Sequence, residues 1–191
     1  MSKISWKGGT LLAPVPPVLV TCGTIDKPNV LTIGWTGICA THPPMTYISV
    51  RPTRYSYDII KSSGEFVINL TTKSMVRAVD FCGVKSGKDT DKFAVCGLHP
   101  EPCSVGNTPC LAESPLSLVC KVVSTTDLVS HTMFLAEIIG IEADERYIDE
   151  NGKLNLHQCG LLAYAHGEYF TLGEKLGTFG YSVRKRKKKR K

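Results

Sequence analysis

The sequence predicts a mainly β protein, either an all-β barrel or an α+β barrel with two or three helices. Strand-like runs rich in β-branched residues occupy both halves of the chain, whereas few segments show helical spacing. Neither G-x-G-x-x-G nor G-x-x-x-x-G-K-[ST] occurs, so a doubly wound dinucleotide-binding sheet and a P-loop are not indicated. Because 191 residues suffice for one full core, we expect a single domain over residues 1–183.

The first half of the chain predicts strands joined by tight turns. Three strand-like runs come first: PPVLVTCGT (16–24), NVLTIGW (29–35) and PPMTYISVRP (43–52). The segment IDKPN between the first two has the composition of a turn. Further along, EFVINL (65–70) predicts another strand, and KSMVRAVDFCGV (73–84) has the apolar spacing of an amphipathic helix.

A short helix is expected to begin directly after Pro52 and to end at Gly64. A residue that precedes proline is pushed toward extended geometry, so Arg51 should lie outside the helix. Thr53 is the expected N-cap, because its hydroxyl can accept a hydrogen bond from an unpaired N–H of the first turn. Glycine is a common residue at a helix end.

The start of this helix is predicted to bind phosphate. Arg51, Thr53, Arg54 and Ser56 surround it. Unpaired N–H groups and the helix dipole favour an anion at this position, and a guanidinium fork matches two phosphate oxygens. This segment alone leaves an alternative open, in which the hydroxyls only cap the helix and the arginines only face solvent.

The second half returns to strands after a long connection. Residues 85–109 are rich in glycine, proline and charge, and a connection of this length is usually functional or lid-like. The strand-like runs that follow are SPLSLVCKVVSTTDL (114–128), TMFLAEIIGIEADERYI (132–148) and the shorter, glycine-broken KLNLHQCGLLAYAHGEYFTLG (153–173).

The net charge of +6 is a property of the C-terminal tail. Residues 184–191, RKRKKKRK, hold eight consecutive cations, and without them 15 basic residues face 17 acidic ones. Such a run repels itself, so we expect a disordered tail and no specific nucleic-acid partner. No apolar run approaches the length of a membrane span, and the N-terminus lacks an apolar signal stretch. We therefore expect a cytoplasmic protein without membrane contact.

The chain shows no protein-based catalytic motif. Its five histidines do not stand at metal-ligand spacing, and G-x-S-x-G and H-E-x-x-H are absent. The eight cysteines include no C-x-x-C pair and are expected to be thiols. A three-thiolate metal site at Cys96, Cys103 and Cys110 stays open as an alternative. The chemistry is therefore expected to come from a bound cofactor.

Polar and aromatic residues just before the phosphate site suit a phosphorylated ring system. Asn29 offers amide donors and acceptors, the backbone from Thr32 to Thr36 can meet a polar ring edge, and Trp35 can form an aromatic wall. An ordinary turn asparagine and a core tryptophan are the alternatives.

The chain resembles the flavin reductase-like proteins with an FMN-binding split barrel, and within them the flavoredoxins. The resemblance rests on the order of PVPPVLVTCGT, NVLTIGWTG, ISVRPTRYSYDIIKSSGEFVINL, DFCG, SGKDTDKF, SHTMFLAEI and YFTLGEKLGTFGYS, from residue 13 to residue 182. It implies a homodimeric split β-barrel with FMN in a groove near the subunit interface. It also implies electron transfer through that FMN from NADH, NADPH or another donor.

The resemblance also implies roles for individual residues. The residues expected to contact the ring and ribityl chain are Asn29, Thr32, Ile33, Gly34, Trp35 and Thr36, and those expected to hold the phosphate are Arg51, Thr53, Arg54, Tyr55 and Ser56. Lys92 is expected to reach the flavin and stabilise its reduced form, although it could be a solvated loop lysine. His131 and Tyr164 would lie beside the ring, but Val129-Ser130-His131 departs from the family's G-D-H element, and Tyr164 could be a strand core residue.

Three functions follow from these observations. The chain could be an NAD(P)H-dependent flavin reductase, or a flavoredoxin-type carrier that takes electrons from a redox protein. The third, a non-redox binding module, would use the basic tail on RNA or membrane.

Overall fold

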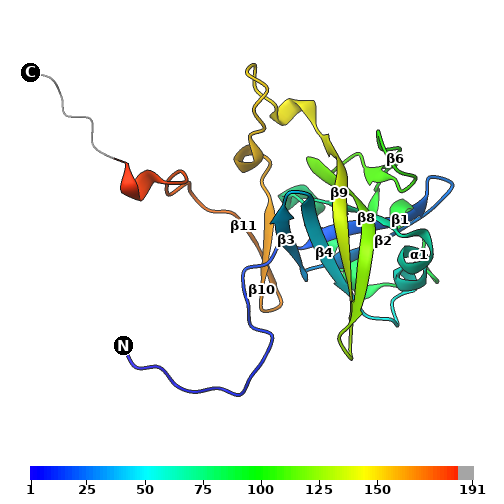
Figure 1. Ribbon diagram of the computed structural model, residues 1–191, viewed down its shortest axis with the longest axis horizontal. Coiled ribbons are helices and arrows are strands. Elements are labelled where there is room, and N and C mark those ends of the chain that lie inside the picture. The colour runs from blue at the N-terminus through cyan, green and yellow to red at the C-terminus, as the bar shows by residue number, and fades with distance from the viewer. Residues whose placement is uncertain (185–191) are drawn as a thin grey trace, which may run out of the picture.

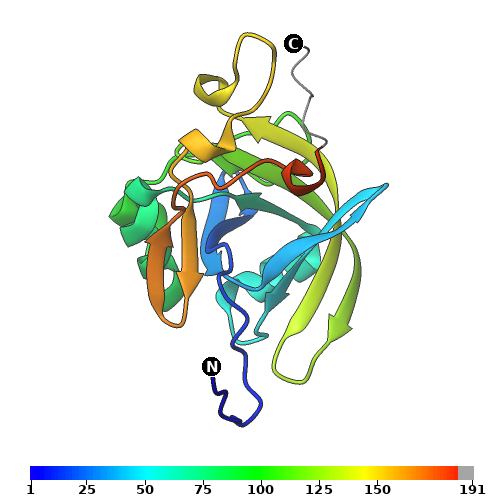
Figure 2. The ribbon, with the colours of Figure 1, turned by 90° about the vertical axis from the view of Figure 1, so that its left-hand side faces the viewer.

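Seven antiparallel strands form one strongly curved sheet, which confirms the mainly β prediction. The computed structural model describes residues 1–184. The strands are β1 (Val18–Thr24), β2 (Lys27–Ile33), β3 (Thr36–Thr41), β4 (Pro44–Val50), β5 (Glu65–Asn69), β8 (Leu116–Asp127) and β9 (Thr132–Ala143), paired in the order β2-β1-β5-β8-β9-β4-β3. Figure 2 shows the sheet curling around its interior. The sequence predicted every strand of this sheet except β3.

Strand β1 is buried on both faces of the sheet. Val18 and Val20 point into the barrel interior, where they pack with Phe66 and Phe134, while Leu19 packs on the other face against residues of the second helix. A strand with two buried faces needs a nearly continuous apolar run, which VLVTC supplies. The outer face of the sheet is therefore covered at β1 by the second helix.

Asparagine 69 joins three parts of the structure through a buried polar network. Its side-chain amide donates to the carbonyl of Leu19 and to the hydroxyl of Thr21, at 3.0 and 3.1 Å. Its Oδ1 accepts from the backbone N–H of Leu111 at 3.0 Å and from the hydroxyl of Ser117 at 2.8 Å. All of these groups are buried and paired, so the network fixes β1, β8 and the segment around Leu111 relative to one another.

Helix α1 spans Tyr55–Ser63 and ends, as predicted, at Gly64, which has φ 68°. The prediction that Thr53 is the N-cap was wrong. Arg54 occupies the cap position with extended geometry, and no side chain accepts a hydrogen bond from the first turn. Pro52 and Thr53 form a turn, which moves the helix start one residue further along the chain.

The amphipathic helix predicted over 73–84 is present as a 3-10 turn, η1 (Lys73–Met75), followed by α2 (Val76–Val84). Its buried residues pack on Leu19 and Val30 of the sheet. The connection 85–109 contains helix α3 (Lys92–Cys96), capped by Asp91, and strand β6 (Pro100–Glu101). Strand β6 pairs with β7 (Cys110–Leu111).

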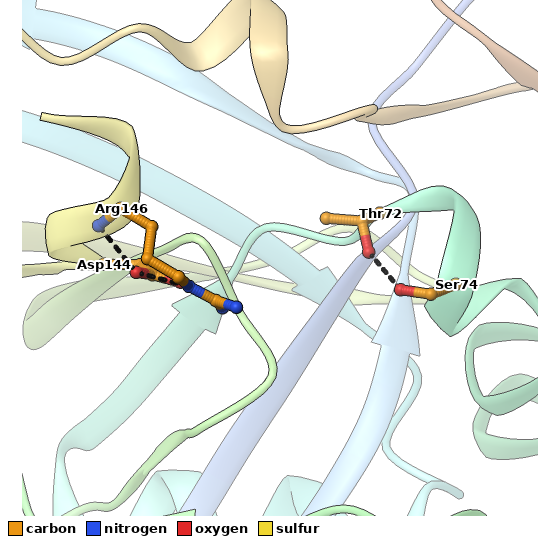
Figure 3. Close-up of polar contacts among 4 residues, drawn as sticks. All are labelled: Thr72, Ser74, Asp144 and Arg146. Atoms are coloured by element: carbon orange, nitrogen blue, oxygen red, sulfur yellow. Dashed lines mark hydrogen bonds and ion pairs between the residues drawn. The ribbon is translucent and has the colours of Figure 1, made fainter.

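The C-terminal part adds a hairpin of β10 (Leu162–Ala165) and β11 (Glu168–Thr171), with 3-10 turns at η2 (Glu145–Tyr147), η3 (Leu156–Gln158) and η4 (Tyr181–Val183). Figure 3 shows two local polar contacts, each within one segment. Thr72 and Ser74 join their hydroxyls at 2.9 Å before α2, and Arg146 Nε donates to Asp144 Oδ2 at 2.9 Å in η2. The N-terminal segment and the described part of the C-terminal segment lie outside the barrel as two arms (Figure 1).

All eight cysteines are free thiols, as the sequence predicted. Within residues 1–184, no helix is both long enough and apolar enough to cross a membrane. The predicted disordered tail falls on residues 184–191, of which all but Arg184 lie outside the described residues.

Candidate functional site

A cavity of about 350 Å³ opens between the end of β2, the β4–α1 connection, α2 and the β10–β11 hairpin. We call it the ring pocket. Its walls are formed by Val15, Pro17, Leu31, Thr32, Ile33, Gly34, Trp35, Ser49, Val50, Arg51, Arg54, Asp80, Gly83, Val84, His131, Tyr164 and Tyr169. The volume lies within the range of small-molecule sites, and the lining mixes aromatic, aliphatic and charged groups.

One side of the ring pocket is cationic and aromatic. Arg51 and Arg54 line it next to His131, whose imidazole lies 4.5 Å from the ring of Trp35. Partial burial and the positive charges of Arg51 and Arg54 lower the pKa of His131, so the imidazole is neutral at neutral pH. Two permanent cations with no acidic ion-pair partner within 4 Å among the described residues therefore face this side of the cavity.

The first turn of α1 faces the same cations. No side chain caps it, and Arg54 stands at the N-cap, so the free N–H groups of the turn remain available to an anion. The helix has nine residues, long enough for its dipole to add to the arginine charges. This arrangement can hold a phosphate or carboxylate at the edge of the ring pocket.

Asn29 and Ser56 lie behind this turn and do not line the ring pocket. Asn29 Nδ2 donates to Ser56 Oγ at 2.6 Å, and both side chains are buried. Asn29 also lines a second cavity of about 880 Å³, together with Tyr55 and Lys92. Of the predicted binding residues, eight line the ring pocket and three line the second cavity, on either side of the α1 start, whereas Thr36, Thr53 and Ser56 line neither.

Lys92 is a buried structural cation, which makes the alternative of a solvated loop lysine wrong. Only 4% of its surface is exposed, and its ammonium donates to the carbonyls of Val30 and Cys82 at 2.7 and 3.0 Å. Burial lowers its pKa. Val30 lies in β2, one of the two edge strands of the sheet, so Lys92 satisfies a carbonyl that has no neighbouring strand. Its amine is not part of the ring-pocket wall.

The side chains of three other predicted residues are not available to a ligand in the ring pocket. The Thr36 hydroxyl donates to the carbonyl of Tyr47 at 2.6 Å inside the β3–β4 pair. The Ile33 side chain is 5% exposed and belongs to the barrel core. Thr53 is exposed and lines neither cavity.

Two of the ring-pocket residues that the sequence analysis missed form a hydrogen bond with each other. Asp80 and Tyr169 come from α2 and β11, and the Tyr169 hydroxyl donates to Asp80 Oδ1 at 3.2 Å. Tyr164, which was predicted, packs against Tyr169 with ring centroids 5.3 Å apart. The helical spacing of 73–84 already placed Asp80 off the buried face, which was the available signal. Nothing local linked it to a residue 89 positions later.

Comparison with known proteins identifies the family. The family model described as "Flavin reductase like domain" matches residues 11–173. The chain belongs to the flavin reductase-like family. This result confirms the resemblance inferred from the sequence, and a likeness to solved split-barrel structures confirms the fold class.

Two solved structures and one curated relative illustrate the likeness of this flavin reductase-like protein. It is 31% identical to flavoredoxin of Desulfovibrio vulgaris (Miyazaki F), with a TM-score of 0.88 and coverage of 96% of this chain and 100% of that one. It is 26% identical to flavoredoxin from Methanosarcina acetivorans, with a TM-score of 0.87 and coverage of 96% of this chain and 100% of that one. An uncharacterized protein of Pyrococcus abyssi is 29% identical over 170 residues, covering 89% of this chain and 97% of the relative.

Residues 1–184 of this flavin reductase-like protein contain no group of three or more His, Cys, Asp or Glu side chains arranged to hold a metal ion. The three-thiolate alternative therefore has no support among the described residues.

We predict that Val129→Gly stabilises the hairpin that carries His131. Val129 has φ 61°, a conformation that costs a residue with a Cβ about 1–2 kcal/mol, and its side chain is fully exposed. Glycine offsets part of this gain through its larger unfolded-state entropy, about 0.5–1 kcal/mol. The free energy of unfolding, measured by urea denaturation, should rise by about 0.5–1 kcal/mol. Val129→Ala keeps the Cβ and is the control; equal stabilities of the two variants would contradict the strain at this position.

We also predict that Lys92→Met destabilises the protein. The substitution leaves the carbonyls of Val30 and Cys82 without their donor, which costs about 1–3 kcal/mol per buried group, partly offset because a buried charge is also removed. Urea denaturation should show a net loss of about 2 kcal/mol. Lys88→Met, at an exposed position in the same connection, should change stability by less than about 0.5 kcal/mol. A Lys92→Met protein as stable as the wild type would show that the two hydrogen bonds are not needed.

Proposed function

We propose that this protein binds FMN and transfers electrons through it. The single observation that carries the proposal is the uncapped start of α1, flanked by Arg51 and Arg54, at the edge of a cavity walled by Trp35, His131 and Tyr164. An anion site next to an aromatic cavity suits a phosphorylated ring. Membership of the flavin reductase-like family and the likeness to two flavoredoxins support the same cofactor.

The cationic side of the site would hold the phosphate. Arg51 and Arg54 supply guanidinium donors, and the first turn of α1 supplies backbone N–H groups. Ser56 is engaged with Asn29, so its side chain fixes the turn from behind. A phosphate bound here would be attracted by three independent features, which are two side chains and one helix terminus.

The aromatic walls would hold the ring. Trp35 is 44% exposed and contacts His131 with the two rings tilted by 42°, while Tyr164 and Tyr169 lie on the β10–β11 hairpin. The backbone of Ile33 and Gly34 lies between them in the wall, where N–H and C=O groups can meet a polar ring edge. The residues present therefore fit a flat heterocycle with a polar rim.

When bound, FMN supplies the electron-transfer chemistry, and the protein supplies binding, orientation and electrostatics. Arg51 and Arg54 would fix the phosphate end and so set the depth of the ring in the pocket. Trp35 and Tyr164 would exclude water from the ring faces they cover. A neutral His131 beside Trp35 would not repel a cationic nicotinamide ring.

The electron donor is either a nicotinamide nucleotide or a redox protein. We favour the flavoredoxin-type carrier for two reasons. The hairpin tip beside His131 exposes Leu128 and Val129, and Val129-Ser130 stands where related reductases have the glycine and aspartate of the G-D-H element. An exposed apolar tip suits contact with a protein. Steady-state oxidation of NADH or NADPH with added FMN separates the two donors.

We further propose that the protein acts as a homodimer. The N-terminal arm exposes Trp6 and Leu12, and the C-terminal arm exposes Leu176 and Phe179, at 75, 88, 82 and 105% of their surface. Both arms leave the barrel on the side of the β10–β11 hairpin (Figure 1), which forms part of the ring-pocket wall. A second copy could cover these side chains near the flavin site.

We predict that Arg54→Ala weakens FMN binding by about 10- to 100-fold with little effect on stability. The charged hydrogen bond to phosphate contributes about 1.5–3 kcal/mol, and Arg54 makes no side-chain cap whose loss would destabilise α1. Equilibrium dialysis should show the loss for FMN and a much smaller one for riboflavin, which has no phosphate.

Arg77→Ala, which removes an exposed arginine of α2 that does not line the ring pocket, is the matched control for net charge. An Arg54→Ala protein that binds FMN as tightly as the wild type would contradict the placement of the phosphate. Equal losses for FMN and riboflavin would do the same.

A further inference from the structure

The ring pocket is electrostatically asymmetric in a way that FMN binding alone does not require. Arg51 and Arg54 are cations in its wall, and Asp80 is the one carboxylate among the described residues that line it. Asp80 stands on α2, which packs against β2 through residues such as Val79. An acidic group is the opposite of what binding of an anionic cofactor or stabilisation of a reduced flavin would favour.

Asp80 is not needed for the packing of its helix. The buried residues of α2 are Ala78, Val79 and Cys82, whereas Asp80 is exposed toward the cavity. The Tyr169 hydroxyl nevertheless donates to its Oδ1 at 3.2 Å across 89 residues of sequence. A surface carboxylate that served only solubility would not need a tertiary hydrogen bond to hold it.

Tyr169 is well suited to keep this carboxylate in place. Its ring is partly buried against Tyr164 and the residues that surround Leu162, so the hydroxyl has a fixed position. Burial and the neighbouring Asp80 raise the pKa of Tyr169 to about 12. The hydroxyl therefore remains a donor throughout the physiological range, and the carboxylate is held against the ring-pocket wall.

We propose that Asp80, held by Tyr169, sets the reduction potential of the bound flavin and makes it a stronger reductant. This inference rests on the proposed FMN site. A reduced flavin carries more negative charge than an oxidised one, so a fixed carboxylate in the pocket wall raises the free energy of the reduced form. Asp80 acts through the electric field in the pocket and transfers no atom. The effect of its negative charge on the potential is opposite to that of the positive charges of Arg51 and Arg54.

The test is the FMN midpoint potential of the full chain saturated with FMN. In Asp80→Asn the carboxylate charge is lost while the side-chain shape and the acceptor for Tyr169 remain. The reduced-to-oxidised ratio at a fixed potential should rise about tenfold, which is about 30 mV for a two-electron couple. Because Asp80 is exposed to the cavity, this difference should shrink as salt is added.

Two controls separate charge from structure. Asp26→Asn removes an exposed carboxylate at the β1–β2 turn, outside both cavities, and should leave the potential unchanged. Tyr169→Phe removes the hydrogen bond but keeps the charge, so its shift should be in the same direction and smaller than that of Asp80→Asn. Asp80→Ala, at an exposed helix position, repeats the test if the asparagine variant does not fold.

The outcomes are distinct. A wild-type protein that holds no FMN in equilibrium dialysis would overturn the proposed function itself. A wild-type protein that holds FMN, with Asp80 variants that share its potential within error, would overturn only the role of Asp80. A shift as large in Asp26→Asn as in Asp80→Asn would also overturn it, because the effect would then reflect net charge alone.

Discussion

The candidate site depends on the hydrogen bond between Asn29 and Ser56. At 2.6 Å and fully buried, it fixes the first turn of α1 against strand β2. Asn29 is itself enclosed, because a Cβ at Gly87 would come within 2.0 Å of its Oδ1. Together with the burial of Tyr57 and Ile60 in the barrel core, this contact holds the uncapped N–H groups in place beside the ring pocket. Asn29 therefore supports the anion site from behind.

The edge strand β2 explains why so much of the site is built on this side of the sheet. Its outer edge has no neighbouring strand, and α2 and Lys92 cover it instead, with the Thr32 hydroxyl donating to the carbonyl of Val79 and the Lys92 ammonium donating to that of Val30. The end of β2 thus lies next to a helix, and the space between them becomes a wall of the ring pocket. The packing of α2 against β2 therefore both protects the sheet edge and forms part of the binding cavity.

The fold and the position of the candidate anion site were largely predictable from the sequence, because both depend on local patterns. Alternating apolar residues gave the long strands, and Pro52, the arginines and Gly64 marked the helix. Long-range pairing was not predictable. Lys92 lies in a connection rich in glycine and charge, and only the covered edge of β2 explains why it is buried. Asp80 and Tyr169 meet across 89 residues, a contact that no local spacing indicates.

The central claim is that this flavin reductase-like protein binds FMN tightly and passes electrons through it. Its most direct test is an absorbance spectrum of the purified protein after gel filtration, followed by anaerobic addition of NADH and then of NADPH. We predict flavin bands that remain with the protein and are bleached slowly or not at all by either nucleotide, as expected of a carrier reduced by another protein. Rapid bleaching by one nucleotide would assign a reductase instead. A colourless protein that also fails to take up added FMN would contradict the account of the site.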